Sequence, residues 1–563
     1  MCTPHFALRE AAPTTLPRRP FLIAAALLAL LAAAPAPAHA ESTAPEASET
    51  TASDGALQQI LERPSFTLDG HEFDLEELKT FYKARQYRPA WETHAEGNRE
   101  ALKTFLTSVA AFADYHGLSQ KAYPTELINR LIASGDEADT VRLELLVTES
   151  LLRLGHDLRG DKVELAQLYP GWTFRREPAP VAEGLAKAVD ERRVNDFIAS
   201  LAPTAPAYLN LTHTLKTYRA MAAKGAWPTI AAGPKLVRGD QGPRVSQLRA
   251  RLVAEGYLPA QAPTEAENEL FTETLQETLA TYQTRNGLQP DGQAGAKTLA
   301  ALNTPPQKRI DQIVANMERW RHMPDSTPTR YAEVNIADAM LNVVEDGKSA
   351  YHSVVVVGRP DRKTPFIQSQ IRSVIFNPSW HVPTKIAQKD ILPKLRKDPH
   401  YLEKLGFVIN GSADDPHGAN IDWNKIKASA FNFRLRQAPG DLNSLGRLKF
   451  DFDNDFAVYM HGTPHQELFE KPERYYSSGC IRLEDPVQFA KIVLASNDGD
   501  WTPERIQAEV DKTNTRWLRI AEPLPLRVVY WTVFEDEDGA INFRHDIYNY
   551  DRFLLESLEG GKS

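Results

Sequence analysis

The sequence reads HGT at residues 461–463 and, after a polar loop, SSGCIRL at residues 477–483. The apolar run before His461 predicts a strand, and Gly479 predicts a turn just before Cys480, so one loop can return both side chains to contact. A thiol attacks as its thiolate, and a histidine can serve as the base that removes the proton. This stretch predicts a mostly-β domain with Cys480 as a nucleophile and His461 as its base.

The other cysteine, Cys2, lies in a segment with the layout of a cleaved export signal, residues 1–40. Basic residues precede an apolar run at residues 21–34, and Ala38-His39-Ala40 supplies a cleavage site. The run is shorter than the ~20 residues that span a bilayer, so an uncleaved anchor is the less favoured alternative. Arg18-Arg19 resembles a twin-arginine signal, which leaves the general and twin-arginine export routes both open. A solitary thiol in an exported protein favours nucleophilic catalysis.

Composition narrows the class of protein. The formal net charge is -9, 42% of the 563 residues are hydrophobic, and nine are tryptophan. An acidic chain without a basic stripe argues against a nucleic-acid partner. The apolar content is typical of a globular protein whose length allows several domains.

The chain before the β-domain is expected to be helical. Residues 41–55 are small and polar and are interpreted as a flexible linker. Leucines at helical spacing predict a scaffold domain over residues 56–230, in which we find no acid–base constellation. A helix within residues 307–325 is expected to return to this scaffold. Residues 231–304 would then be an inserted module.

That module has two predicted helix faces and specific turn sequences. Its run Gly287-Leu288-Gln289-Pro290-Asp291-Gly292 continues to Thr298 and resembles the three-helix peptidoglycan-binding domain. The resemblance implies binding to the cell wall, but a module of this fold can also act only as a spacer.

Residues 326–556 have the pattern of a β-rich domain. Strands are predicted at residues 331–336, 339–344, 353–357, 373–377, 448–452, 456–460, 526–534 and 541–548. The pattern lapses at residues 386–443, an insertion that is either a lid or a passive decoration. The predicted fold class is multidomain α+β, with a helical scaffold, a small three-helix module and a mostly-β domain that carries the lid insertion.

Residues around Cys480 predict how the site works. The backbone of Ser478, Gly479 and Cys480 can direct N–H groups at one point and form an oxyanion hole. No carboxylate adjoins His461, so a backbone carbonyl, such as that of Gly462, is expected to orient the ring. Arg482 can hold a substrate carboxylate through its guanidinium fork.

The motifs together resemble the L,D-transpeptidases with a YkuD-type catalytic domain, in their large Gram-negative branch. Further blocks that carry the resemblance are residues 358–365, 377–383, 443–450 and 548–550. The family often has His where Ser478 stands, so His461 has no second histidine to assist it. The resemblance implies a substrate-binding set of Arg482, Tyr459, Trp380 and Asn377, and Gly462 is grouped with the oxyanion turn.

The resemblance implies a periplasmic enzyme that joins peptidoglycan stem peptides by 3→3 cross-links. Cys480 would attack the L-centre carbonyl of diaminopimelate in a tetrapeptide donor, release D-Ala, and pass the acyl group to a diaminopimelate amine. It also implies no metal or organic cofactor, inhibition by carbapenems, and work beside cell-wall synthases or carboxypeptidases.

Alternative functions stay open at this point. The same cysteine could use water as acceptor, as an L,D-carboxypeptidase or as an amidase that releases a protein from the wall. A zinc peptidase is disfavoured, because Gly462 and Pro464 interrupt any helix that would present His461 and His465 together. A non-catalytic wall-binding scaffold is disfavoured by the intact Cys480, His461 and Arg482.

Overall fold

The computed structural model describes residues 52–68, 70–91, 96–134, 136, 139–260 and 268–560. The expected export signal and residues 41–51 of the expected linker lie outside them. The remaining linker residues begin helix α2 (Ala52–Leu61). In the described ranges, no helix combines the length and apolar character that a membrane crossing needs.

The described chain forms two compact units. The first comprises residues up to Leu158 together with Ala179–Ala202, and the second comprises Arg159–Pro178 and everything from Pro203 onward. Unlike the predicted scaffold domain, the first unit excludes helix α10 (Pro206–Ala222), which pairs with α15 (Pro306–Arg321) in the second. The expected return helix therefore exists, and its partner is the last helix of the expected scaffold.

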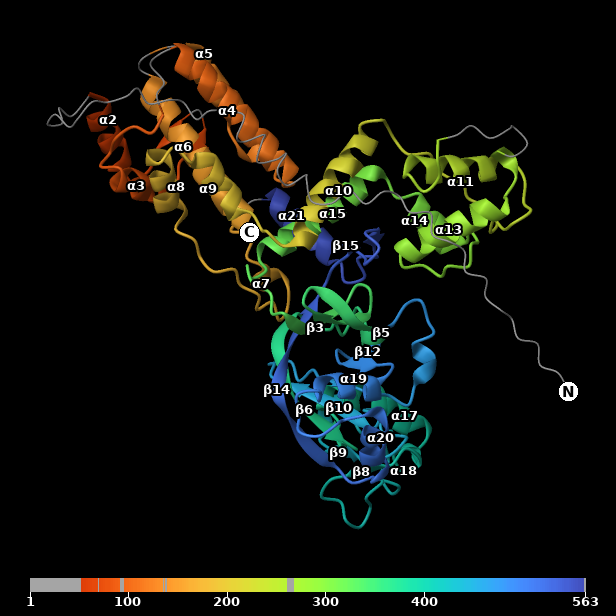
Figure 1. The fold of residues 1–563 in the computed structure, drawn as a ribbon. Helices are drawn as coiled ribbons and strands as arrows, with labels where there is room; N and C mark the ends of the chain where they lie inside the picture. Colours follow the sequence, from red (N-terminus) through yellow and green to blue (C-terminus); the bar gives the residue numbers. More distant parts are fainter. Residues whose placement is uncertain are drawn as a thin grey trace. The chain divides into compact units, whose positions relative to one another are not determined.

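The first unit is helical, as the leucine pattern predicted. The central α6 (Thr140–Arg159) buries Leu145, Leu151 and Leu158 completely. Asp74 caps α3 by accepting hydrogen bonds from the amides of Glu76 and Glu77. The other elements are α3 (Leu75–Ala84), α4 (Glu96–Tyr115), α5 (Thr125–Ser134), α8 (Val181–Asp190), α9 (Val194–Leu201), the short η1 (Gln120–Ala122), and the strands β1 (Thr67–Leu68) and β2 (His71–Glu72). Figure 1 shows this unit in red to orange.

Within residues 231–260 and 268–304, the described part of the expected inserted module, three helices lie in the second unit. They are α11 (Pro243–Ala254), α13 (Glu273–Arg285) and α14 (Ala296–Leu302), and they share a core that contains Leu248, Leu275 and Leu279. Gly292 adopts a φ of +65° where a Cβ would lie 2.5 Å from Gln276, so its turn requires glycine.

The β-rich domain contains a sheet of nine strands in the order β12-β5-β13-β11-β10-β6-β14-β3-β4, and β4 also pairs with β5, which closes the sheet on itself. Most predicted strands appear, but the one expected over residues 456–460 is reduced to two residues, Met460–His461. The strands are β3 (Arg330–Asn335), β4 (Met340–Glu345), β5 (Lys348–Gly358), β6 (Ile367–Phe376), β10 (Leu448–Phe452), β11 (Met460–His461), β12 (Tyr475–Ser477), β13 (Ile481–Leu483) and β14 (Arg516–Val529).

Helices cover one face of this sheet. Phe489 of α19 (Pro486–Val493) packs edge-on against Phe450 with ring centroids 4.9 Å apart. Ile506 and Val510 of α20 (Pro503–Asp511) join the same core. The chain then forms a hairpin, β15 (Val533–Glu535) and β16 (Ile541–Phe543), and ends in α21 (Tyr550–Gly560); the short α7 (Leu165–Leu168) belongs to this unit too.

The insertion expected over residues 386–443 folds around its own hydrophobic core. Leu395, Phe407 and Trp423 are buried together in it. The elements inside these bounds are the π-helical turn η3 (Ala387–Ile391), α17 (Leu392–Lys397), α18 (Tyr401–Lys404), β8 (Phe407–Ile409), η4 (Ala428–Ala430) and β9 (Leu435–Gln437), while β7 (Trp380–His381) and α16 (Thr384–Ile386) lead into them. The strands pair in the order β7-β9-β8, and Figure 1 shows these elements gathered at one end of the sheet.

Candidate active site

Two adjacent strands place the predicted catalytic residues on one face of the sheet. β11 and β13 are parallel, with Met460 opposite Ile481 and His461 opposite Arg482. Met460 and Ile481 are fully buried in the core. Because successive side chains in a strand alternate between faces, the flanking residues face the other way. These are Tyr459, His461, Cys480 and Arg482.

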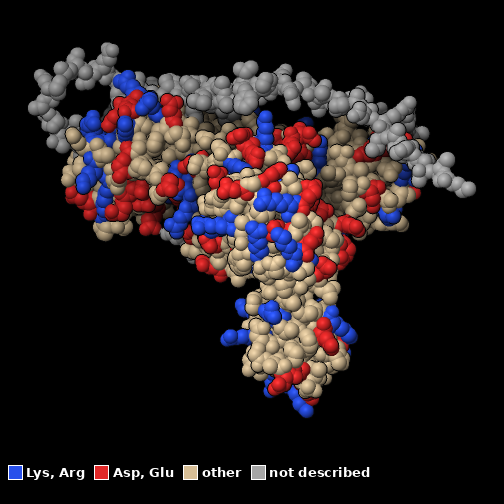
Figure 2. All heavy atoms as spheres, turned by 60° about the horizontal axis from the view of Figure 1, so that its bottom comes forward, with Lys and Arg blue, Asp and Glu red and all other residues tan. Residues whose placement is uncertain are grey.

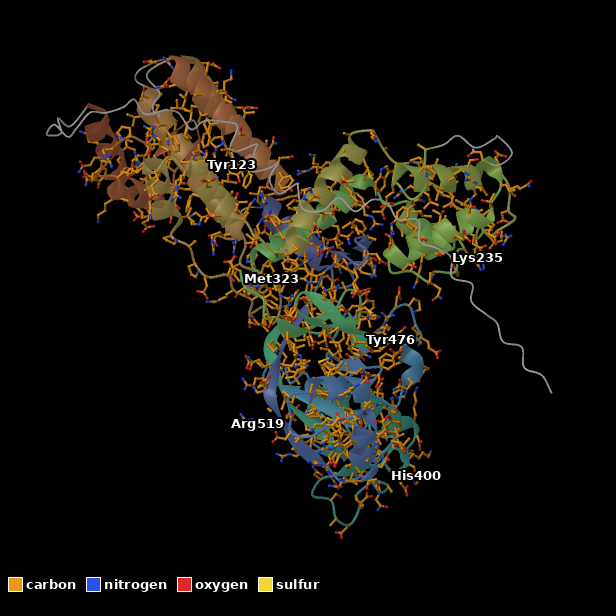
Figure 3. All side chains as sticks on the ribbon, viewed as in Figure 1. Tyr123, Lys235, Met323, His400, Tyr476 and Arg519 are labelled. Carbon is orange, nitrogen blue, oxygen red and sulfur yellow. The ribbon has the colours of Figure 1, made fainter. Side chains whose placement is uncertain are left out.

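The turn before β13 holds Cys480 in a defined conformation. Gly479 has a φ of +116°, which favours glycine, and its N–H donates to the hydroxyl of Ser477 over 3.1 Å. The Ser477 hydroxyl in turn donates to the Cys480 carbonyl over 2.5 Å. The half-buried Cys480 is a free thiol. Figure 3 labels Tyr476 on β12 and Arg519 on β14, strands on opposite sides of the site in the sheet order.

A backbone carbonyl orients His461, as the sequence predicted. The ring Nδ1 lies 2.5 Å from the carbonyl oxygen of Gly462, and the side chain is almost completely buried. Since a carbonyl only accepts, Nδ1–H donates, and Nε2 is left unprotonated to act as a base. Burial, and then the positive charges of Arg482 and Lys449, lower the pKa of His461 to about 3.

The thiol starts out neutral as well. Burial raises the pKa of Cys480, while the Tyr459 N–H and the positive charges of Arg482 and Lys449 act in the opposite direction. Burial also raises the pKa of Tyr459, and its hydroxyl is hydrogen-bonded to Cys480 and to Trp380. A neutral thiol beside a neutral imidazole suits proton transfer during attack rather than a preformed ion pair.

Arg482 is available to a substrate anion. Among the described residues it has no ion-pair partner within 4.0 Å, and its Nε is buried without a hydrogen bond. Burial, with the nearby Arg359, lowers the pKa of Arg482. An unpaired buried donor costs free energy until a ligand satisfies it.

Three residues of the predicted site donate hydrogen bonds to other groups of the protein. Asn377 is completely buried, and its amide donates to the carbonyl of Val510 at the end of α20 over 2.9 Å. The N–H of Gly462 donates to Leu448, and that of Gly479 to Ser477, so neither amide is free for an oxyanion. The amides of Ser478 and Cys480 donate to no described residue.

Two residues that sequence reasoning missed also border the site. Arg362 donates to the hydroxyl of Ser478 over 2.9 Å and pairs with Asp390 of the lid insertion. Lys449 lies opposite His461 in the register and 4.3 Å from the centre of the Tyr459 ring. Both occur in the quoted sequence blocks, whose charged residues were the available signal.

A metal centre is not evident in the described ranges. No three His, Cys, Asp or Glu side chains there are grouped as ligands. His465 instead lies 3.3 Å from Glu467 at the surface. On the face drawn in Figure 2, basic and acidic side chains are interspersed.

Three segments of the chain match known protein families. Residues 329–511 match the family described as the L,D-transpeptidase catalytic domain. The chain carries an L,D-transpeptidase catalytic domain. Residues 241–302 match the "Putative peptidoglycan binding domain", and residues 76–215 match a family described as "Scaffold domain". The predicted multidomain α+β fold class is confirmed.

Among the proteins to which the chain is similar is a "Putative L,D-transpeptidase" of Haemophilus influenzae, which is 35% identical over 255 residues. The match covers 45% of this chain and 50% of that protein, so the chain spans about half the length of the curated relative. Two solved structures are also similar. The L,D-transpeptidase from Xylanimonas cellulosilytica matches at 14% identity with a TM-score of 0.15, covering 53% of this chain and 98% of that one. The Ldtfm-avibactam carbamoyl enzyme matches at 12% identity with a TM-score of 0.18, covering 56% and 98%. These scores are too low to support a structural inference.

Proposed function

We propose that this protein is a periplasmic transpeptidase that links diaminopimelate residues of peptidoglycan stem peptides through a thioester on Cys480. The single observation that carries the proposal is the placement of Cys480, His461 and Arg482 on one sheet face, with the imidazole tautomer selected by Gly462. A family match to the catalytic domain supports the reaction class.

In the proposed first step, Cys480 Sγ attacks the carbonyl of the L-centre of diaminopimelate in a tetrapeptide stem. His461 Nε2 takes the thiol proton and passes it to the departing amine. The S–C bond forms, the C–N bond breaks, and D-Ala leaves. Arg482 would hold a carboxylate of the donor through its guanidinium fork.

In the proposed second step, the side-chain amine of another diaminopimelate attacks the thioester. A C–N bond forms and the C–S bond breaks, while His461 accepts a proton from this amine and returns it to the Cys480 sulfur. The tetrahedral intermediate of both steps carries an oxyanion. The amides of Cys480 and Ser478, which donate to no described residue, replace Gly479 and Gly462 as the candidate donors.

Residues and domains outside the catalytic set are proposed to bind the peptidoglycan substrate. The matched peptidoglycan-binding module would bring the enzyme to the wall, and Trp380 and Tyr459 would contact the stem. Export by the N-terminal signal and inhibition by carbapenems belong to the same proposal. Cell-wall synthases and carboxypeptidases are the expected partners.

The test is incubation of the purified protein with a disaccharide-tetrapeptide, followed by mass spectrometry. Release of D-Ala with formation of a cross-linked dimer is the expected result, and the Cys480→Ala variant should give neither. A tripeptide monomer as the main product would establish the carboxypeptidase alternative. An unchanged tetrapeptide would overturn the proposed function.

A further inference from the structure

The nucleophile turn is tied to a loop that lies far from it in sequence. Thr364 is completely buried, and its hydroxyl donates to the carbonyl oxygen of Gly479 over 2.9 Å. The same hydroxyl oxygen accepts the N–H of Gly358 over 2.8 Å. Thr364 therefore connects the end of β5 to the residue that precedes Cys480.

This hydrogen bond acts on the direction of one amide. The carbonyl of Gly479 and the N–H of Cys480 belong to the same planar peptide, and in a trans peptide they point in opposite directions. A donor that holds the carbonyl oxygen therefore also aims the Cys480 N–H away from Thr364. That N–H donates to no described residue, whereas the Gly479 N–H is used by Ser477.

A tyrosine near the C-terminus clamps the Thr364 loop. The Tyr548 hydroxyl donates to the carbonyl of Gly358 over 2.5 Å and accepts the N–H of Thr364 over 3.2 Å. Lys363 reaches back to the same segment, where its ammonium donates to the carbonyl of Tyr548 over 2.9 Å and lies 4.3 Å from the centre of the Tyr550 ring. The loop is thus held at both ends by the tail of the chain.

The tail is itself anchored in the core. Tyr530 of the segment after β14 accepts the N–H of Tyr548 over 3.0 Å and donates to Asp546 over 2.9 Å. Tyr548 is almost completely buried, and burial raises its pKa to about 12, so its hydroxyl stays protonated as a donor at neutral pH. All three residues lie beyond the segment matched to the catalytic family, residues 329–511.

We propose that Thr364 is a positioning residue that aims the Cys480 N–H at the developing oxyanion, and that Tyr548 keeps Thr364 in place for this task. The proposal rests on the acyl chemistry assigned to Cys480 in the proposed function, but not on which acyl donor the enzyme uses. It makes the C-terminal tail part of the active-site architecture.

Two small reagents separate this role from a purely structural one. Acylation by p-nitrophenyl acetate passes through an oxyanion, since Sγ adds to the ester carbonyl, the C–O bond breaks, and p-nitrophenolate leaves while His461 takes the thiol proton. Alkylation by iodoacetamide displaces iodide from carbon and forms no oxyanion. The full chain is used throughout, with Cys480→Ala as the background control.

The variants are Thr364→Val, which keeps the shape and removes the hydroxyl, Thr364→Ser, which keeps the hydroxyl, and Tyr548→Phe. We expect Thr364→Val to slow the p-nitrophenolate burst by about tenfold or more, approaching the ~10²–10³ that loss of an oxyanion donor costs. Its alkylation rate should stay close to that of the wild type. Thr364→Ser should restore the burst, and Tyr548→Phe should slow it less than Thr364→Val does.

Several outcomes would overturn the proposal. These are a wild-type burst rate in Thr364→Val, an equal fall in burst and alkylation rates, failure of Thr364→Ser to restore the burst, or a wild-type enzyme that iodoacetamide labels but p-nitrophenyl acetate does not acylate. Failure of the proposed function is a separate result. A wild-type enzyme that shows the burst yet leaves a tetrapeptide stem unchanged loses the transpeptidase assignment, while the role of Thr364 stands.

Discussion

The Nδ1 of His461 donates to the carbonyl oxygen of Gly462, the next residue in the chain, over 2.5 Å. The backbone carbonyls of Gly462 and Leu445 both act to raise the pKa of His461, against the larger effect of burial. This contact selects the tautomer in which Nε2 is the free base without a carboxylate partner. Because the ring is buried beside Arg482 and Lys449, it remains neutral through the physiological pH range.

Alkylation of Cys480 should report the raised pKa of its thiol. The iodoacetamide rate at pH 7 should be lower than that of a free cysteine and should rise about tenfold per pH unit past pH 8.5, because only the thiolate reacts. Rates at several pH values, with the Cys480→Ala variant as blank, make the measurement. A rate that is already high and constant between pH 5 and pH 7 would instead reveal a thiolate–imidazolium pair.

The buried His461 should make the unit that carries it sensitive to acid. Its pKa is about 3 in the folded protein against 6.5 in the unfolded chain, so below pH 6.5 the unfolded state binds the extra proton. The free energy of unfolding should therefore fall by about 2 kcal/mol from this residue between pH 7 and pH 5. Urea unfolding of the wild type and of His461→Gln at both pH values isolates this contribution. Equal pH dependence in the two proteins would contradict the lowered pKa.

Replacing Arg482 by methionine should separate stability from activity. The wild-type guanidinium is largely buried without an ion pair, so Arg482→Met should raise the free energy of unfolding by about 1 kcal/mol. Loss of a charge-assisted hydrogen bond to the donor should lower kcat/KM by about 10- to 100-fold. The exposed Arg519 on β14 provides the matched control, and Arg519→Met should change neither quantity. A lower melting temperature in Arg482→Met would show that this arginine is structural.

A carbapenem should acylate Cys480. Its strained lactam carbonyl is an electrophile for the thiol, and its carboxylate offers an anion to Arg482. We expect the intact mass to rise by one carbapenem, and peptide mapping to place it on Cys480 whether or not a chelator is present. An adduct on a serine, or protection by a chelator, would exclude the cysteine mechanism.

The three-helix module should retain the protein on isolated sacculi independently of catalysis. Excision is unsuitable as a test, because Arg309 of α15 donates to Asn286 of the module over 2.5 Å and would lose that partner. The full chain should instead be sedimented with sacculi before and after its thiol is blocked by a carbapenem. Equal retention is expected, and loss of retention on blocking would show that only the active site holds the wall.

Several features of the candidate site could be predicted from the sequence because they depend on residues close together in the chain. Cys480 and His461 are brought together by neighbouring parallel strands, and the Gly462 carbonyl is adjacent in the chain, so both relations are local enough to be read from spacing. The buried contact of Asn377 could not be predicted, because α20, which contributes its carbonyl acceptor, lies more than 130 residues later. The lid insertion was predicted, but not its strands β8 and β9, which are only three residues each.

By itself the sequence predicted most of the helices and strands and the residues of the proposed chemistry. Hydrophobic periodicity predicted the scaffold helices, the module and most strands, because each amphipathic element records its own buried face. The tertiary structure decided which amides are free and which distant groups support the nucleophile. The Gly479 N–H donates to the Ser477 hydroxyl, and the Gly479 carbonyl accepts from Thr364. The N–H of Thr364 in turn donates to the Tyr548 hydroxyl. Hydrogen bonds between residues more than a hundred positions apart depend on how the whole sheet closes, and no local pattern specifies that closure.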